Sequence, residues 1–235
     1  MMGIGGRLKA AAAGNTHSID LELASTQQLT AADSASLSIT GDMTIECWVK
    51  IESQPANNKS LTIVSKTDSD TQRSYRFFNE NLAGTVSLAL GISSDGSAQT
   101  VKRVTYTITT ATWTHLAVVY TAAGGTIDFY VNGAQQGTQQ SGAPTSIFDG
   151  TALLSIGANN DGGEDHFDGL IDDVRIWATT RTEAQINDNK SLEIDSAASL
   201  NGSWHLNNVL TDSSGNSNTL TNVNSATFTT DVPFS

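Results

Sequence analysis

Apolar and polar residues alternate along most of this chain. SIDLEL (residues 18–23) and MTIECWVKI (residues 43–51) both place apolar side chains at every second position, the period of a strand with one buried face. In the second segment, Met43, Ile45, Cys47, Val49 and Ile51 share one face, and Trp48 lies on the other. Similar patterns predict further strands at residues 61–66, 74–79, 85–92, 101–108, 114–121, 126–133, 152–158 and 170–177, with two or three more after residue 199.

Turn and capping signals separate these segments. Asn132-Gly133 supplies the positive φ angles of a tight hairpin turn. The segment TRTEAQINDNKSL begins near Thr182, a suitable N-cap, and predicts one short helix near 182–192. Many short strands with turns between them indicate an all-β fold, a two-sheet antiparallel sandwich. We expect one domain over 18–235, preceded by a flexible Gly- and Ala-rich arm at residues 1–17.

Charge and composition narrow the function classes. The net charge of −12 repels a phosphate backbone, so nucleic acid is a poor partner. The single cysteine, Cys47, allows no disulfide within the chain. No run approaches the ~18 apolar residues that span a bilayer, so we expect no membrane insertion.

Several motifs together resemble one family. They are LSITGDMTIECWVKIES, WTHLAVVYTAAGGTIDFYVNGAQQG, LSIGANNDGGEDHFDGLIDDVRIWATTRTEAQI and SWHLNNVLTDSSGNSNTLTN. In order and over roughly residues 18–235, they are similar to the laminin-G-like jelly-roll domains of the concanavalin-A-like lectin/glucanase superfamily. In many relatives the last motif precedes the others, so this chain resembles a circularly shifted arrangement. The resemblance implies a jelly roll, often a calcium ion, and recognition of glycans or proteins.

A calcium site is one expectation from the resemblance. Asp212 and Asn216 of the DSSGN loop match the family's metal-binding loop, and Asp172 could add a third oxygen ligand. The alternative is an Asx-type turn in which Asp212 caps its own backbone.

The acidic loop that starts at residue 159 is a candidate glycan site. Its amides and carboxylates could bind sugar hydroxyls or calcium, and the alternative is a solvated loop. Trp48 and Trp177 could supply an aromatic platform, although aromatic residues in sandwiches are more often part of the core. The candidate glycan-binding residues are Asn159, Asn160, Asp161, Glu164, Asp165, Trp48 and Trp177.

Catalysis is the least favoured function. Asp20 and Glu22 lie two apart, and a retaining glycosidase needs paired carboxylates about 5–5.5 Å apart. The third acid of the laminarinase-like pattern is missing, so a solvent-facing strand is the simpler interpretation. Asp172 and Asp173 are adjacent and should point to opposite faces of the sheet. The four histidines lack zinc-ligand spacing, so we expect no enzyme.

Two functions therefore remain open. One is a non-catalytic module that binds a glycan or a cell-surface protein; the other is a structural part of a virion, anchored to its neighbours through residues 1–17. The start of the chain shows no clear export signal, which favours a phage fibre or capsid-decoration protein with a lectin-like domain for host adhesion. The alternatives are an extracellular bacterial carbohydrate-binding or adhesion module and, remotely, a glycoside hydrolase. Whether copies of the chain form a homo-oligomer is left open.

Overall fold

The computed structural model describes residues 9–10, 14–69, 71–161 and 165–235. One antiparallel sheet contains β2 (Ser18–Leu21), β4 (Met43–Ile51), β9 (Trp113–Thr121), β10 (Thr126–Val131), β11 (Ala134–Gln140), β13 (Gly169–Trp177), β15 (Leu200–Trp204) and β17 (Thr227–Thr229). The other contains β3 (Gln28–Ala31), β5 (Lys59–Lys66), β6 (Tyr75–Leu82), β7 (Thr85–Ile92), β8 (Thr100–Thr105), β12 (Leu154–Ile156) and β16 (Thr221–Val223).

Two smaller features complete the fold. The strand β1 (Lys9–Ala10) pairs with β14 (Ile194–Ser196), and the α-helix α1 spans Glu183–Asn189. Short 3₁₀ turns lie at Leu23–Ser25 and Ala122–Gly124. The predicted jelly-roll sandwich with one short helix is therefore confirmed, while β3 was not among the predicted strands.

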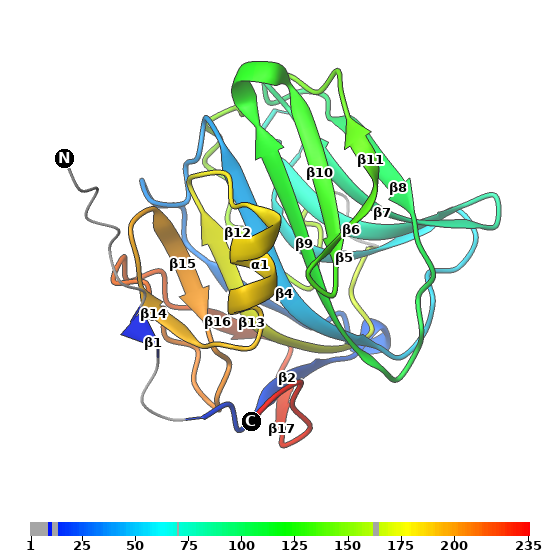
Figure 1. Ribbon diagram of the computed structural model, residues 1–235. Helices are drawn as coiled ribbons and strands as arrows, with labels where there is room; N and C mark the ends of the chain where they lie inside the picture. The colour runs from blue at the N-terminus through cyan, green and yellow to red at the C-terminus, as the bar shows by residue number, and fades with distance from the viewer. Residues whose placement is uncertain (1–8, 11–13, 70, 162–164) are drawn as a thin grey trace.

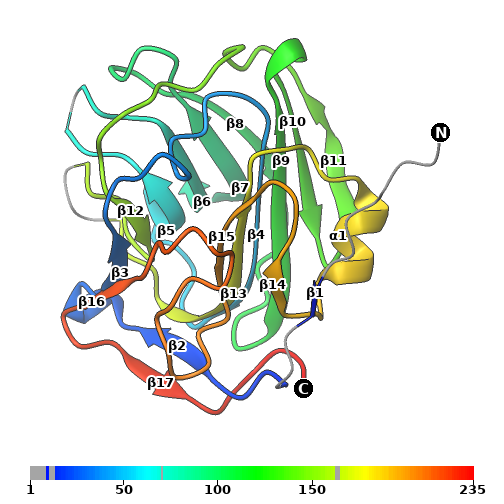
Figure 2. The same ribbon diagram turned by 90° about the vertical axis from the view of Figure 1, so that its left-hand side faces the viewer.

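The two sheets face each other across the hydrophobic core (Figures 1 and 2). The order of the first sheet is β11-β10-β9-β4-β13-β2-β17, with β15 also pairing with β13, and that of the second is β16-β3-β12-β5-β6-β7-β8. The alternate residues of β4 that were expected inside are all buried in this core: Met43, Ile45, Cys47, Val49 and Ile51. The period-2 pattern thus predicts the inner face of this strand correctly.

The outer face of the eight-stranded sheet carries a second layer. Figure 2 shows α1 and β14 lying against this face, away from the seven-stranded sheet. Ile186 of α1 packs on Ala117, Val119 and Tyr130 of β9 and β10. Trp177 of β13 packs with Ile194 of β14 and Leu200 of β15 in a separate apolar cluster. Side chains on the outer face of β4, β9 and β13 beneath this layer are therefore shielded from water.

The helix begins where the capping signal predicts. The Thr182 hydroxyl accepts the backbone N–H of Gln185 at 3.2 Å, and the Gln185 side chain accepts the N–H of Thr182 at 2.9 Å. This reciprocal capping box satisfies two backbone donors that the first turn leaves without partners. The predicted hairpin turn is also present, since Asn132 and Gly133 both have positive φ angles.

A β-bulge in β13 changes which residues share a face. Asp172 pairs with Trp48 but Arg175 pairs with Glu46, so β13 has one extra residue over this stretch. Asp173 takes a positive φ of 44° there. The bulge keeps Ile171 in the core with Val174 and Ile176.

The expectation that Asp172 and Asp173 point to opposite faces is therefore wrong. Asp172 lies opposite Trp48, and Asp173 contacts Arg175 on the same covered outer face. The extra residue of the bulge places both carboxylates on that face, because it interrupts the alternation of side chains along the strand.

The predicted arm at residues 1–17 falls partly outside the described residues. Its described portions contact the sandwich: Lys9–Ala10 pair with β14, and the Asn207 side chain accepts hydrogen bonds from Thr16. Asn15 is buried. Among the described residues, no helix has both the length and the apolar character needed to cross a membrane.

Candidate functional site

Asp212, the first predicted calcium ligand, is committed to the backbone. One carboxylate oxygen accepts the N–H groups of Ser203 at 3.0 Å and Ser214 at 2.9 Å, and the other accepts that of Asn218 at 2.9 Å. A carboxylate offers about four lone-pair positions, so three are already used. This is the geometry of the Asx-type turn.

The other two predicted calcium ligands also bind protein groups. The Asn216 amide donates to the carbonyl oxygens of Leu200 at 3.1 Å and Asn201 at 3.2 Å. Asp172 accepts a hydrogen bond from Asn15 at 2.6 Å, so it has partners separate from those of the loop. These three residues fit a cation poorly, and calcium at this site stays a prediction.

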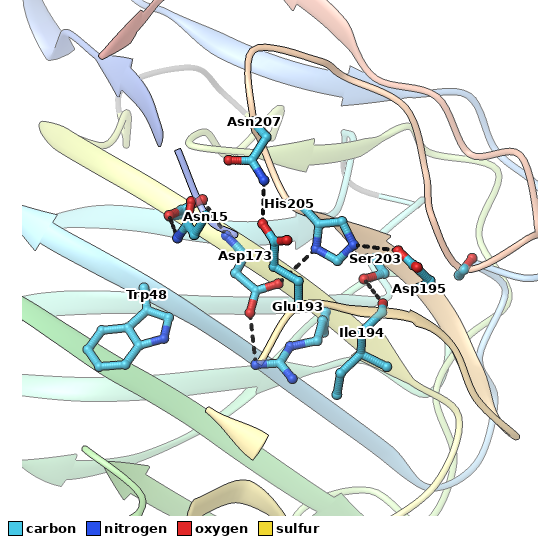
Figure 3. A network of polar contacts seen from close by, with 12 residues as sticks. Asn15, Trp48, Asp173, Glu193, Ile194, Asp195, Ser203, His205 and Asn207 are labelled. Atoms are coloured by element: carbon cyan, nitrogen blue, oxygen red, sulfur yellow. Dashed lines mark hydrogen bonds and ion pairs between the residues drawn. The ribbon is translucent and has the colours of Figure 1, made fainter. Parts of the chain in front are cut away.

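A polar network fills the space between β13 and the covering segment. His205 lies between two carboxylates, with Nδ1 3.2 Å from Asp173 and Nε2 3.2 Å from Asp195 (Figure 3). Asp173 also lies 3.0 Å from Arg175, while Asn207 donates a hydrogen bond to Glu193. These contacts connect β13 to the segment at residues 193–207, which contains β14 and β15.

Burial sets the protonation of this network. Burial, together with the neighbouring Asp173 charge, raises the pKa of Asp172 to about 8, although the hydrogen bond from Asn15 lowers it. For His205, burial opposes the charged form, but the hydrogen bond and charge of Asp173, with Glu193 and Asp195, raise the pKa above its ordinary value. Asp172 is thus largely neutral near pH 7.

Glu46 lies at the centre of a second buried group on the same face. One of its oxygens accepts the Trp177 indole N–H at 2.8 Å and lies within 3.7 Å of Arg175 and Arg181. His115 lies 3.6 Å from the other oxygen, but burial, with repulsion from Arg175, holds its pKa well below the usual value. His115 is therefore a neutral, structural histidine with no exposed partner for acid–base chemistry.

The two tryptophans predicted as a glycan platform are buried. Trp48 is 8% exposed, and its N–H donates to the Lys190 carbonyl at 2.5 Å. Trp177 is 1% exposed, with the Arg181 guanidinium 3.9 Å from its ring centre. Both lie on the outer sheet face, as the alternation predicts, but α1 and the segment after it cover that face.

The acidic loop after β12 is tied to the seven-stranded sheet. Asp161 forms an ion pair with Arg73, and Asp165 lies 2.8 Å from Arg76. Asn159 accepts a hydrogen bond from Thr67 at 2.5 Å.

The remaining two residues of the predicted loop site differ in how they are placed. Asn160 forms an isolated bridge with Asp68 and is partly exposed, whereas Glu164 lies outside the described residues. Asp161 and Asp165 of this loop are therefore paired with arginines, which leaves fewer of their oxygens for a sugar or cation.

A different group of acids lies at one end of the eight-stranded sheet. Oxygen atoms of Asp20, Glu22 and Glu52 all lie within 4.8 Å of one another, an arrangement that could hold a metal ion. Burial and then repulsion from neighbouring acids raise the pKa values of Asp20 and Glu52. The spacing of Asp20 and Glu22 hinted at this group, but Glu52 comes from another strand end and joins only in the fold.

One partly exposed tryptophan was not among the predicted residues. Trp113 at the start of β9 is opposite Lys50 of β4, and its N–H donates to Asp231 at 2.8 Å. Lys50 also binds Asp231, so the Asp231 carboxylate links the Trp113 and Lys50 side chains. The alternation of β9 places Trp113 on the outer face, but only the fold shows that the cover ends before it.

The described surface includes two hollows of ligand size. An open groove of about 620 Å³ lies between the β10–β11 turn and the start of α1, lined by Gly133, Glu183 and Asn187 among others. A smaller cavity of about 330 Å³ lies beside the β6–β7 turn and the end of β8. Both are within the size range of small-ligand sites, about 300–1,000 Å³.

Comparison with known proteins identifies similar sequences and similar folds. A family model for the concanavalin A-like lectin/glucanases superfamily matches residues 23–187. Over 153 residues, 64% of this chain, the sequence is 29% identical to the adhesion G-protein coupled receptor V1 of Danio rerio. That match covers 2% of the receptor.

Two solved structures share the fold. A Bacteroides ovatus protein to which carbohydrate binding has been ascribed has a TM-score of 0.72 at 19% identity, covering 95% of this chain and 62% of that one. Tailspike protein 2 of the Escherichia coli O157:H7 bacteriophage CAB120 has a TM-score of 0.56 at 16% identity, covering 87% of this chain and 31% of the tailspike. This chain spans less than two thirds of each of these relatives, and at such identities the likeness shows the fold alone.

Proposed function

Because this chain belongs to the concanavalin A-like lectin/glucanases superfamily, we propose that it recognises glycans without cleaving them. The observation that carries the proposal is the match of residues 23–187 to that superfamily, within a complete two-sheet lectin-type sandwich. The buried acids and histidines on the covered face support a non-catalytic role, because groups sealed from solvent cannot reach a polymeric substrate.

The biological setting is part of the same proposal. We assign the chain to a virion surface, as a fibre or capsid-decoration protein that adheres to host cells; the alternative is an extracellular bacterial adhesion module. The likeness to a phage tailspike over 87% of the chain supports the first setting, and that to an adhesion receptor fits either. Antibody labelling of purified phage particles decides between them, since a virion protein is detected on the particle.

A printed glycan array tests recognition. The fluorescently labelled full chain should bind a subset of neutral or sialylated oligosaccharides and should be displaced by an excess of the same free sugar. Absence of binding to every printed glycan would contradict the proposal.

Glycoside hydrolysis is a second candidate because the acid group at the sheet end has suitable proximity. The oxygens of Asp20, Glu22 and Glu52 lie within 4.8 Å of one another. This spacing is close to that of a retaining glycosidase, whose two carboxyls are about 5–5.5 Å apart. Sugar release that Asp20→Asn or Glu22→Gln abolishes would establish the hydrolase. We expect no release from either the wild-type chain or these variants.

A further inference from the structure

Three segments of the chain line the smaller cavity, which is open to solvent. They are the β6–β7 turn with the start of β7, the end of β8 with the residues after it, and the loop between β4 and β5. The lining residues are Gln54, Gly84, Thr85, Val86, Thr105, Tyr106, Thr107 and Ile108. The cavity of about 330 Å³ is thus a hollow at one edge of the seven-stranded sheet.

The turn that forms one wall is held by side chains of the neighbouring loop. The N–H of Gly84 is within 3.2 Å of the Asn57 side-chain oxygen and 3.0 Å of that of Asn81. The N–H of Ala83 donates to Asn58 at 3.3 Å. Ala83 and Gly84 both have positive φ, and an added Cβ on Gly84 would meet no atom within 4 Å, so this wall faces open space. The wall is therefore fixed before any ligand arrives.

A second set of hydrogen bonds holds the opposite wall. The Gln54 amide donates to the Ile108 carbonyl at 3.3 Å, and the Gln136 amide of β11 donates to the Thr105 carbonyl at 3.0 Å. The N–H of Tyr106 reaches the Val86 carbonyl at 3.4 Å, which links this wall to the first. A preorganised site loses less entropy on binding.

The cavity offers unused hydrogen-bonding groups. Thr85, Thr105 and Thr107 are exposed, and across the described residues their hydroxyls have no hydrogen-bond partner. The side-chain oxygen of Gln54 is likewise unpaired within that part of the chain. Each hydroxyl can both donate and accept, which matches the hydroxyl groups of a sugar.

The rest of the lining is apolar and uncharged. Val86 is partly exposed, while Tyr106 and Ile108 are buried beneath the hollow. Arg103 and Glu80, which flank this part of the sheet, form an ion pair with each other. A neutral ligand with hydroxyls on its edge and C–H groups on its face fits this surface better than a charged one.

We infer that this cavity binds one or two residues of a neutral glycan. The inference rests on the proposed function and names the site where recognition takes place. Thr85, Thr105 and Thr107 donate and accept hydrogen bonds with the sugar hydroxyls, and Val86 contacts its apolar face.

Cavity variants of the full chain test this site on the same glycan array. Thr105→Trp fills the hollow and should reduce binding to neutral glycans at least tenfold, while Thr107→Val removes one hydroxyl at constant shape and should weaken it several-fold. The controls are Thr138→Trp and Thr138→Val, because Thr138 is exposed on β11 and does not line the cavity. Circular dichroism and melting curves establish that each variant folds.

The outcomes separate the site from the function. Loss of binding in both cavity variants, with both controls unchanged, supports the site. Wild-type binding that the folded cavity variants retain overturns the cavity as the site and leaves glycan recognition intact. Binding confined to sialylated glycans overturns the neutral class, and no binding by the wild-type chain overturns the proposed function itself.

Discussion

Asp212 shows how a side chain with the sequence context of a metal ligand can serve the backbone instead. Its carboxylate accepts three N–H groups, from Ser203, Ser214 and Asn218. Asp212→Ala leaves these donors without their partner, which should lower the free energy of unfolding by about 1–3 kcal/mol. Thermal melting of the variant beside the wild-type chain measures the effect.

A chelator distinguishes the two roles of Asp212. If the carboxylate serves only the backbone, removal of calcium leaves the wild-type Tm unchanged. A fall in Tm with chelator that Asp212→Ala abolishes would support the calcium prediction, because a cation that binds only the folded chain stabilises it.

Asp172 should make stability depend on pH. Its pKa rises from 3.8 in the unfolded chain to about 8 in the fold, so between these values the folded chain holds a proton that the unfolded chain releases. The stability that the folded chain gains from the proton on Asp172 is fully present below pH 3.8 and is lost as pH rises through about 8. The wild-type Tm should therefore fall between pH 5 and pH 8.

The variant Asp172→Asn isolates this effect. His205 also has a raised pKa and acts in the same direction above pH 6.5, but it is unchanged in the variant. The groups facing Asp172 are Asn15, Asp173 and Glu193. Between pH 5 and pH 8, we expect the Tm of Asp172→Asn to fall less than that of the wild-type chain. Equal slopes of Tm against pH for the two proteins would show that Asp172 does not titrate in this range.

The secondary structure elements can be predicted from the sequence where strand alternation and helix capping determine them. Alternation in Met43–Ile51 predicts which side chains of β4 enter the core, and the cap at Thr182 predicts where α1 begins. The bulge at Asp173 is not visible in the pattern, because it depends on how β13 pairs with its neighbours. A strict two-residue period therefore assigns Asp172 and Asp173 to opposite faces.

The candidate site was harder to predict than the elements. Trp48 and Trp177 lie on the predicted sheet face, but segments distant in sequence cover them, and local alternation contains no information about that cover. The cavity beside Gly84 has the same origin. Its walls come from three segments of the chain, and only their packing brings Thr85, Thr107 and Gln54 to one hollow.

The capping box of α1 should stabilise the helix and, through it, the fold. Thr182→Ala removes the hydroxyl that accepts the Gln185 N–H and should cost about 1 kcal/mol of stability. Thr180→Ala is the control, since Thr180 lies just before the helix and makes no capping contact. A lower Tm for Thr182→Ala alone is the expected result, and equal melting of both variants would show that the cap contributes nothing.

In the whole molecule, the covered outer face of the eight-stranded sheet and the open cavity at the edge of the seven-stranded sheet are separate surfaces. The cover of α1 and β14 lies over buried ion pairs within the eight-stranded sheet, which join Arg175 to Glu46 and Asp173. Arg175 also donates a hydrogen bond to the Asn189 carbonyl of α1 at 3.2 Å, which links the sheet to its cover. Breaking one member of such a buried group leaves the others uncompensated and is strongly destabilising. We therefore assign the covered face to stability and the edge cavity to recognition.

Native mass spectrometry of the full chain with an array-positive oligosaccharide tests the central claim most directly. Recognition without cleavage predicts a complex whose mass equals that of the protein plus the intact sugar, and a free oligosaccharide that keeps its length over hours. Absence of a complex would contradict glycan recognition, and the appearance of shortened sugars would show that the protein is a hydrolase instead.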